Sequence, residues 1–322
     1  MKRSVVVPIA AALLALLPLQ VPAQAPWPTK PVKIISVFPP GGSVDQVARI
    51  FAAQLTTQLG QQFIVDNRGG ASGSIGTQVV ATSPADGYTF GVVFDTHAVN
   101  PSLIPNLPFD TVKDLAPVML VGTSPMAIVA HAAQPYRDFR DVLAAAKKQP
   151  IAIGSIGTGS LGHLAMAQIG NLQHVEFTHI PYRGGGPLMT DAVGGQVPLA
   201  IGTVFLVNPH VKGGRLKALA VTSARPSPQM PGVGTVAQQG VPGFSALAWW
   251  GVIAPAGTPS AIVKRMHEEL ARALKDPAVA QKLTDQGMEI VGGGPEELDR
   301  FLRSEIARWA QVVKDNKIKA GD

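Results

Sequence analysis

The chain has 322 residues, of which 46% are hydrophobic and 15% are charged, and its formal net charge is +6 at pH 7. This composition excludes a disordered protein, and the length allows two hydrophobic cores, because single cores rarely grow beyond about 250–300 residues. Basic residues form no dense run and aromatic residues make up only 6% of the chain, so we predict no nucleic-acid partner.

The first 23 residues have the layout of a secretory signal peptide. A positive start at Lys2 precedes an apolar run over 5–19 that is too short to span a membrane, and small residues follow. We expect cleavage after Ala23, because a cut two residues later would leave Pro26 first, a poor geometry for a peptidase. The chain has no cysteine to carry a lipid. These features predict export to the periplasm without a stable membrane anchor.

After this segment, short strands alternate with helices, which is typical of parallel α/β sheets. The apolar residues of the helix expected at 44–59 fall on one face at helical spacing. In chain order, the first series consists of a strand at 33–38, a helix at 44–59, a strand at 63–66, a helix near 74–82 and a strand at 89–94.

Two long extended apolar segments, at 118–130 and 249–254, are interpreted as strands that cross between two lobes. They divide the mature chain into a discontinuous lobe 1, residues 24–124 and 251–322, and a lobe 2, residues 125–250. Between the crossings we expect helices at 138–148, 160–170 and 187–193 and strands at 151–156, 175–182, 197–204 and 216–222. Three further helices are expected to begin at Thr258-Pro259, Asp276-Pro277 and Gly294-Pro295.

Four glycine-rich turns follow predicted strands, two in each lobe. In the first turn, Gly41 and Gly42 follow Phe38 and precede a helix. The free N–H groups and the positive dipole end of such a helix bind a carboxylate or another anion, although the glycines could simply form a turn capped by Ser43 or Asp45. Turns at strand ends of open α/β sheets meet at one crevice, so we expect one binding cleft. The other three turns lie at 67–76, 154–163 and 182–187.

The turn at 154–163 contains the dinucleotide pattern G-x-G-x-x-G. That pattern should open the first βαβ unit and precede an acidic residue by about 20 positions, whereas Glu176 is closer, so we reject a dinucleotide site. An anion site that uses the hydroxyls of Thr158 and Ser160 remains. Arg183 in the last turn could bind a carboxylate through two hydrogen bonds, but a lone arginine beside a turn is more often a surface residue.

Catalytic and metal-binding motifs are absent from the sequence. No G-x-S-x-G elbow surrounds Ser160 or Ser74, and neither H-E-x-x-H nor G-x-x-x-x-G-K-[ST] occurs. His163 could act as a base, although a helix histidine is more commonly packed against its neighbours. We therefore predict no catalytic residue, no metal and no cofactor, and a protein that is not an enzyme.

Short motifs from Trp27 to the C-terminus follow one another in an order seen in a known family. They lie at 39–45 (PPGGSVD), 66–70 (DNRGG), 84–89 (PADGYT), 100–103, 106–110, 157–160 with 163–164, 181–185 (PYRGG), 250–251 and 254–259 (APAGTP). In these motifs the chain resembles the substrate-binding proteins of tripartite tricarboxylate transporters, also called Bug-type periplasmic receptors.

The resemblance implies an α/β, two-lobed type II periplasmic-binding-protein fold, with the lobes joined by two crossing strands and a ligand cleft between them. It implies a carboxylate held by the facing glycine loops, partly through bridging waters. Carried over by motif, the ligand-binding residues are Gly41, Gly42, Ser43, Asp45, Gly157, Thr158, Ser160 and Asp191, with Phe38, Thr96 and Phe205 expected to line the cleft.

The predicted function is capture of a small carboxylate by cleft closure and its delivery to the membrane components of a tripartite transporter. A dicarboxylate, an aromatic or nicotinate-like acid and an acidic amino acid all remain candidates, and we expect a monomer. Replacing Gly42 by a β-branched residue should abolish binding, through lost left-handed geometry and a blocked approach. Two alternatives stay open: a ligand-sensing partner of a membrane signalling receptor, and a soluble enzyme acting on a small acid.

Overall fold

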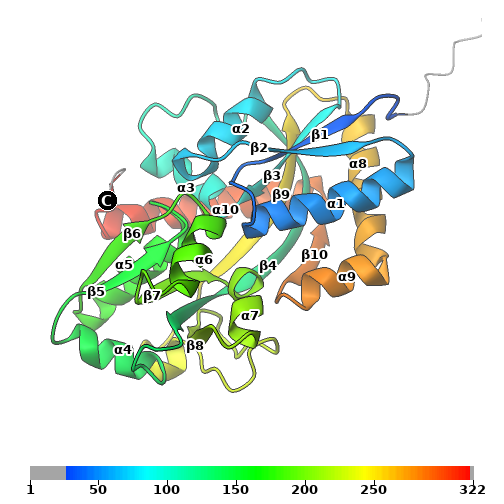
Figure 1. Cartoon of the computed structure of the whole chain (residues 1–322). Coiled ribbons are helices and arrows are strands. Elements are labelled where there is room, and N and C mark those ends of the chain that lie inside the picture. The colour runs from blue at the N-terminus through cyan, green and yellow to red at the C-terminus, as the bar shows by residue number, and fades with distance from the viewer. Residues whose placement is uncertain (1–26, 320–322) are drawn as a thin grey trace, which may run out of the picture.

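In the computed structural model, which describes residues 27–319, ten strands form a continuous sheet (Figure 1). The strand order is β2-β1-β3-β9-β4-β7-β5-β6, and β10 and β8 also pair with β4. The predicted signal peptide lies outside the described residues. The strands are β1 (Val32–Ser36), β2 (Phe63–Asn67), β3 (Thr89–Phe94), β4 (Leu115–His131), β5 (Ile151–Ser155), β6 (Phe177–Pro181), β7 (Leu199–Thr203), β8 (Leu216–Val221), β9 (Leu247–Pro255) and β10 (Glu289–Gly293).

The strand β4 belongs to both halves of the sheet. Up to Pro125 it pairs antiparallel with β9, and from Met126 onward it pairs antiparallel with β7 and β8. Beyond β9, on one side of β4, β1 runs parallel to β2 and β3. On the other side of β4, β5 runs parallel to β6 and β7. We call the half that contains β1–β3 lobe 1 and the half that contains β5–β8 lobe 2.

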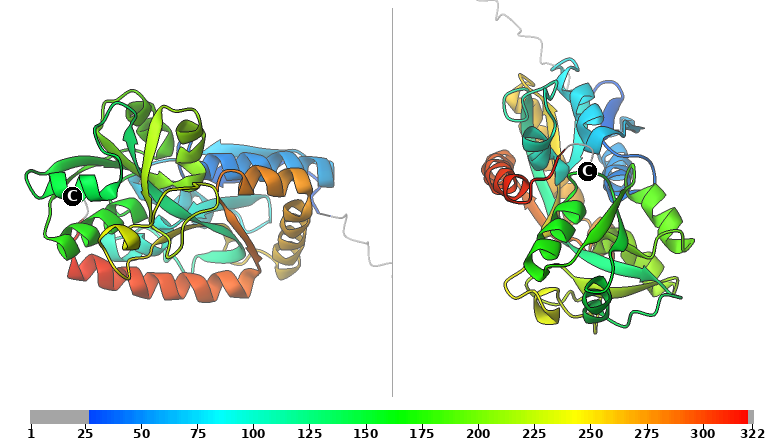
Figure 2. Two further views of the ribbon diagram at one scale, coloured as in Figure 1. Left: turned by 90° about the horizontal axis from the view of Figure 1, so that it is seen from below. Right: turned by 90° about the vertical axis from the view of Figure 1, so that its left-hand side faces the viewer.

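Helices cover both lobes, and the last one lies along the two of them. Figure 2 shows α10 on one side of the molecule, where it packs on α3 and β4 and reaches α5 of lobe 2. The helices are α1 (Ser43–Leu59), α2 (Ser74–Ala81), α3 (Thr96–Leu103), α4 (Phe139–Ala146), α5 (Leu161–Gln173), α6 (Gly185–Val193), α7 (Val204–Lys212), α8 (Ser260–Lys275), α9 (Pro277–Thr284) and α10 (Pro295–Asp315).

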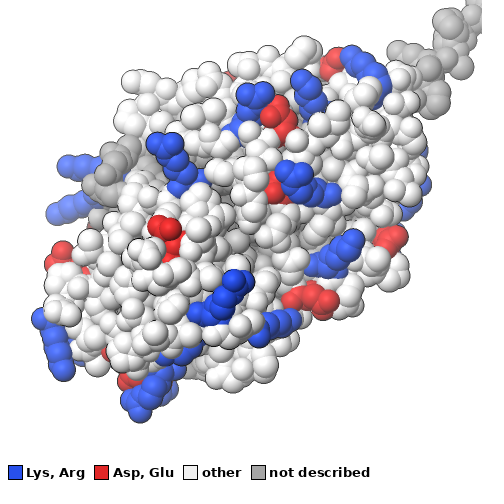
Figure 3. All heavy atoms as spheres, viewed as in Figure 1, with Lys and Arg blue, Asp and Glu red and all other residues white. Residues whose placement is uncertain are grey.

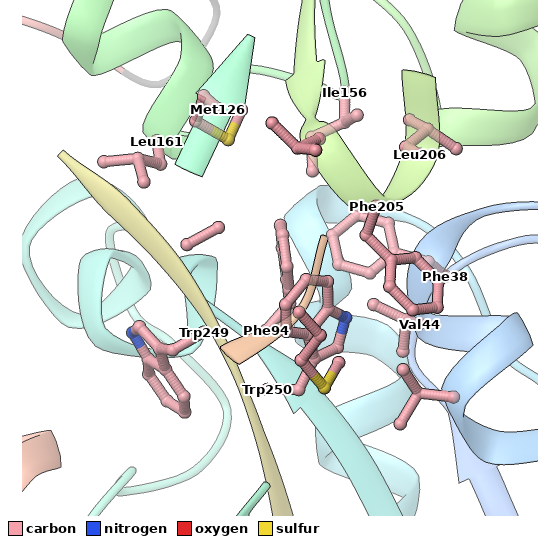
Figure 4. Packing of buried hydrophobic residues seen from close by; sticks show 14 of the residues in the cluster. Phe38, Val44, Phe94, Met126, Ile156, Leu161, Phe205, Leu206, Trp249 and Trp250 are labelled. Carbon is pink, nitrogen blue, oxygen red and sulfur yellow. The ribbon is translucent and has the colours of Figure 1, made fainter. Parts of the chain in front are cut away.

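An aromatic cluster fills the junction between the lobes (Figure 4). The ring centroid of Trp250 on β9 lies 5.2 Å from that of Phe94 and 5.5 Å from that of Phe205, and Phe94 also meets Phe38 edge-on at 6.2 Å. All four side chains are buried. Full burial of such a side chain stabilises a fold by about 1.5–3 kcal/mol, so this cluster joins β9, lobe 1 and α7 of lobe 2 into one core.

Three elements differ from the sequence-based expectation. The strand expected at 197–204 ends at Thr203, and α7 follows it because the Thr203 hydroxyl caps that helix by accepting the Leu206 N–H at 3.1 Å. The apolar start of α7 resembles a continued strand, and Pro209 inside it weakens the helical pattern. The helix α3, which contains Pro101, was not expected from the sequence either. The same holds for β10, a short strand rich in glycine that pairs irregularly with β4.

The charged side chains are dispersed over the face shown in Figure 3, where several Lys and Arg residues lie beside an Asp or Glu. One ion pair of the protein joins Arg68 to Asp66, at 3.0 Å. Within residues 27–319, no helix is both long and apolar enough to cross a membrane.

Candidate functional site

Two neighbouring cavities lie between the lobes and share Phe38 and Ile156 as walls. The larger one, here called the outer cleft, has a volume of ≈ 740 Å³. All four glycine-rich turns contribute to its lining, through residues 38–40, 67 and 69–72 of lobe 1 and residues 156–158 and 181–183 of lobe 2.

The smaller cavity, here called the inner chamber, has a volume of ≈ 10 Å³, about the space of one water molecule. Its polar lining comes from Gly42, Ser43, Gly185 and Thr203, and its other walls are apolar side chains that include Met126 and Leu206 (Figure 4). No charged side chain lines it among the described residues. The chamber therefore offers backbone N–H groups and two hydroxyls in a water-poor setting.

Helix N-termini from both lobes face the inner chamber. The helix α1 starts at Ser43 after Gly42, and α6 starts at Gly185 after Gly184; neither N-cap residue makes a side-chain capping bond. The first turn of a helix leaves its N–H groups without helical acceptors, and the first N–H of α1 that finds one is that of Gln46. Unpaired amides and two positive dipole ends thus meet at one point, which is an anion-binding arrangement.

Three consecutive glycines allow lobe 2 to contact the first turn of lobe 1. A Cβ on Gly186 would lie 2.6 Å from the Pro40 carbonyl oxygen, and one on Gly184 would lie 3.0 Å from Pro39 Cδ. A Cβ on Gly42 would lie 3.5 Å from the Gly185 nitrogen, which is an ordinary contact. Side chains larger than hydrogen at 184 and 186 would therefore hold the lobes apart.

The backbone of the first turn corrects one expectation about Gly42. Its φ is −80°, so it is extended, and the left-handed residue is Gly41 with φ +82°. A β-branched residue at Gly42 would therefore act by blocking the approach of lobe 2 and would not lose a left-handed conformation.

The carboxylate of Asp45 stabilises this turn by hydrogen bonds. It accepts the Gly41 N–H at 3.0 Å, an Asn67 side-chain N–H at 2.9 Å and the Arg49 Nε–H at 2.9 Å. Burial, the largest single influence, raises the pKa of Asp45, but the hydrogen bonds from Arg49, Gly41 and Asn67 together lower that pKa below its ordinary value of 3.8. The carboxylate stays charged, and Arg49 neutralises it close to the anion site.

Two hydrogen bonds cross from one lobe to the other beside the cavities. Ser72 of lobe 1 donates its hydroxyl hydrogen to the Thr158 carbonyl oxygen at 2.5 Å, and the Leu161 N–H at the start of α5 points to Asp95 Oδ1 at 3.5 Å. Burial raises the pKa of Asp95 well above its ordinary value of 3.8. The two lobes are therefore in direct contact at these two points beside the cavities.

The structure brings five of the predicted site residues to the cavity walls: Phe38, Gly42, Ser43, Gly157 and Thr158. Of the other six, Gly41 is exposed and does not line either cavity, and the remaining five lie behind those walls. The hydroxyl of Ser160 caps α5 by accepting the His163 N–H at 3.3 Å, Thr96 is buried at the start of α3, and Phe205 is buried against Trp250.

Asp191 stands behind a cleft wall as well. It accepts the hydroxyl hydrogen of Tyr182 at 2.9 Å, and Tyr182 lines the outer cleft. Burial and this hydrogen bond raise the pKa of Tyr182 to about 12, so its hydroxyl stays neutral and remains oriented toward Asp191.

Sequence reasoning missed Thr203 and Gly185 as lining residues of the inner chamber. A signal for Gly185 was present, since it belongs to the turn at 182–187 that precedes a predicted helix. Thr203 lay inside the predicted strand at 197–204, so its position as a helix cap was hidden. Within residues 27–319, no group of three or more His, Asp or Glu side chains could hold a metal ion.

Comparison with known proteins places this site in a family. Residues 47–318 match the tripartite tricarboxylate transporter family receptor, and the chain belongs to this family. It is 37% identical to the "UPF0065 protein in tcbD-tcbE intergenic region" of Pseudomonas sp. strain P51, over 91% of this chain and 88% of that protein.

Two solved structures share the fold at a level that shows common ancestry. The R. palustris protein Rpa4515, solved with adipate, is 34% identical with a TM-score of 0.87, over 91% of this chain and 99% of that one. MatC from Rhodopseudomonas palustris, solved with bound malate, is 30% identical with a TM-score of 0.83, over 89% and 100%.

These findings confirm the predicted family and fold class. The chain has the α/β, two-lobed type II periplasmic-binding-protein fold and belongs to a family of periplasmic solute-binding proteins, which are not enzymes. The residue boundaries assigned to the lobes stay a prediction.

Proposed function

We propose that this protein captures a small carboxylate between its lobes and delivers it to the membrane components of a tripartite tricarboxylate transporter. The observation that supports this most is the pair of uncapped helix N-termini, α1 and α6, which face each other across the lobe boundary. In this proposal, the acid group enters the inner chamber of the open protein, and the amides near Ser43 and Gly185 bind it as the lobes close.

The outer cleft would receive the rest of the ligand. Its side chains include the apolar Pro39, Ile75 and Ile156, and Arg183 is its only Lys or Arg among the described residues. Its other polar side chains bond within the protein, as Asn67 does to Phe38 and Asp45. An acid with an apolar body fits this wall, and the adipate and malate in the two solved relatives are both carboxylates.

A thermal-shift screen tests the binding proposal. The acids are adipate, malate, benzoate, nicotinate and glutamate, and nicotinamide is the neutral counterpart of nicotinate. A ligand at 100 times its Kd should add about 2.7 kcal/mol of stability. At least one acid should raise the midpoint of unfolding while nicotinamide does not. No shift with any acid, or equal shifts with nicotinate and nicotinamide, would contradict the proposal.

Delivery to a transporter rests on family membership. Uptake of the radiolabelled acid by cells that contain or lack this protein tests it directly, and a Gly186→Ala variant provides a second negative control. Equal uptake with and without the protein would favour the sensing role instead. Export is tested by mass spectrometry of the periplasmic protein, which should begin at Gln24.

A further inference from the structure

Arg183 places a positive charge in the wall of the outer cleft. Among residues 27–319 it is the only charged residue that lines this cavity, and its guanidinium makes no ion pair or hydrogen bond with them. By contrast, Arg49 and Arg68, which lie beside the turns of lobe 1, are each paired with an aspartate, at 2.9 and 3.0 Å. Within the described chain no anion neutralises Arg183, so this position is open to an anionic group of a ligand.

Three neutral polar side chains of the outer cleft already donate their hydrogens within the protein. Both side-chain N–H bonds of Asn67 point to acceptors in lobe 1. The hydroxyl of Ser72 donates to a carbonyl oxygen of the opposite lobe at 2.5 Å, and that of Tyr182 donates to Asp191 at 2.9 Å. A ligand would have to displace these bonds to use the same donors, whereas the N–H groups of Arg183 can bind it without breaking one.

Arg183 lies close to the proposed site of the acid group. It stands two residues before Gly185, which lines the inner chamber at the start of α6, and two residues of chain span at most about 7 Å. The outer cleft and the inner chamber also share Phe38 and Ile156 as walls (Figure 4). One short ligand can therefore reach the start of α6 with one end and the Arg183 guanidinium with the other.

The charges around the two cavities favour a second negative charge on the ligand. Arg183 precedes Gly184, the N-cap of α6, and the positive end of a helix disfavours a cation unless an anion is near. In the described chain, no Asp or Glu side chain lines either cavity. A ligand with two carboxylates is therefore stabilised here, whereas an ammonium group meets no carboxylate in the walls.

We propose that Arg183 determines specificity for a dicarboxylate without an ammonium group: one acid group binds at the start of α6, and the second pairs with the Arg183 guanidinium. This inference rests on the proposed function of the cleft. A guanidinium and a carboxylate can form two parallel hydrogen bonds. Because Arg183 is exposed, solvent screens the pair, so the second acid group should tighten binding about tenfold and not by the larger factor of a buried pair.

The first experiment compares acids that differ only at one end, by calorimetry on the wild-type protein. The pairs are succinate with butanoate, glutarate with pentanoate, and adipate with hexanoate, in which a methyl group replaces the second carboxylate. At least one diacid should bind about tenfold more tightly than its partner, and glutarate should bind more tightly than glutamate, which adds only an ammonium group. Affinities equal within about threefold in all three pairs, or a preference for glutamate, would overturn the proposal.

The second experiment repeats the most discriminating pair with Arg183→Gln, which removes the charge at an exposed position. The affinity for the diacid should fall about tenfold while that for its monoacid partner changes by less than about threefold, so the preference is lost. Arg68→Gln is the matched control, because Arg68 lies in the facing turn but is paired with Asp66 and does not line the cleft; it should keep the wild-type preference. An Arg183→Gln variant that also keeps this preference would contradict the assignment.

The outcomes separate this inference from the proposed function. If monoacids and diacids bind equally well, or if the preference survives in Arg183→Gln, carboxylate capture stands and the role of Arg183 is wrong. If no acid of either kind binds to the wild-type protein, the proposed function is contradicted and this inference falls with it. A diacid preference that disappears only in Arg183→Gln would support both.

Discussion

The two lobes support their glycine loops with different chemistry. In lobe 1, the charged carboxylate of Asp45 holds the Gly41 N–H and is itself paired with Arg49. In lobe 2, the loop amides are held by acceptors that are not carboxylates: Ser155 Oγ accepts the Gly157 N–H, and His163 Nδ1 accepts the Gly159 N–H. The loops resemble each other in sequence, but the groups behind them respond differently to pH.

This difference shows that two loops of similar sequence can depend on pH in different ways. The pKa of Asp45 is lowered, so its support persists down to acidic pH and is lost only as the pH falls through that lowered value. In lobe 2, the Gly159 N–H is held instead by an uncharged acceptor, Nδ1 of His163.

The largest effect is expected from a change that prevents the two loops from meeting. In Gly186→Ala, the new Cβ would lie 2.6 Å from the Pro40 carbonyl of the opposite lobe, so closure should fail and acid affinity should fall about 100-fold or more, which corresponds to about 2.7 kcal/mol. Calorimetry measures this. Gly294→Ala, whose Cβ would meet nothing closer than 3.6 Å, is the matched control, and equal affinities in the two variants would contradict closure at this point.

The next effect concerns the charged support in lobe 1. Asp45→Ala removes the acceptor of the Gly41 N–H and should lower the free energy of unfolding by about 2 kcal/mol, with a roughly tenfold loss of acid affinity. Urea unfolding and calorimetry measure the two quantities. Asp66→Ala on the next strand breaks the half-exposed ion pair with Arg68 and should cost about 0–1 kcal/mol. An Asp45 variant as mild as this control would contradict the account.

A smaller effect is expected at Asp95, a buried carboxyl without an arginine partner. Since its pKa is raised, the folded protein holds its proton more tightly than the unfolded chain, and stability falls as the pH rises from about 3.8 through the raised pKa. Asp95→Asn should remove this fall and raise the midpoint of thermal unfolding at pH 7 by on the order of 2 °C. If the midpoint of thermal unfolding of Asp95→Asn fell below that of the wild type by the same amount at pH 4 and pH 7, the account of Asp95 would be contradicted.

The smallest effect is expected at Arg183. Its guanidinium lines the outer cleft but is exposed, and the acid group is proposed to be bound by neutral amides rather than by a buried ion pair. Arg183→Ala should therefore change the Kd of a monocarboxylate such as benzoate by less than about threefold. A loss of 100-fold would assign the acid group to the arginine and move the site out of the inner chamber.

The sequence predicts the fold well where a local signal is strong. The pairs Asp276-Pro277 and Gly294-Pro295 predict the starts of α9 and α10, and the alternation of strands with helices predicts the parallel parts of both lobes. The helices α3 and α7 were missed, because each contains a proline and α7 continues an apolar run. Their formation depends on packing and on the Thr203 cap, which a pattern of single residues does not reveal.

The site divides in a similar way. Glycine turns at strand ends predict the location of the cleft, because strand topology alone brings them to one edge. Which atoms face the ligand depends on side-chain hydrogen bonds that sequence does not record. Thus Asp45 and Asp191 lie behind the walls, where they bond Gly41 and Tyr182. Thr203, at the end of β7, lines the inner chamber where it caps a helix that was not expected.

A crystal structure of the protein with a bound acid tests the central claim most directly. The account predicts that a carboxylate lies between the first turns of α1 and α6, within hydrogen-bonding distance of amides near Ser43 and Gly185 or of waters that bridge to them, with the remainder of the ligand in the outer cleft. A carboxylate bound elsewhere, with these two helix N-termini facing solvent or a neutral part of the ligand, would contradict it.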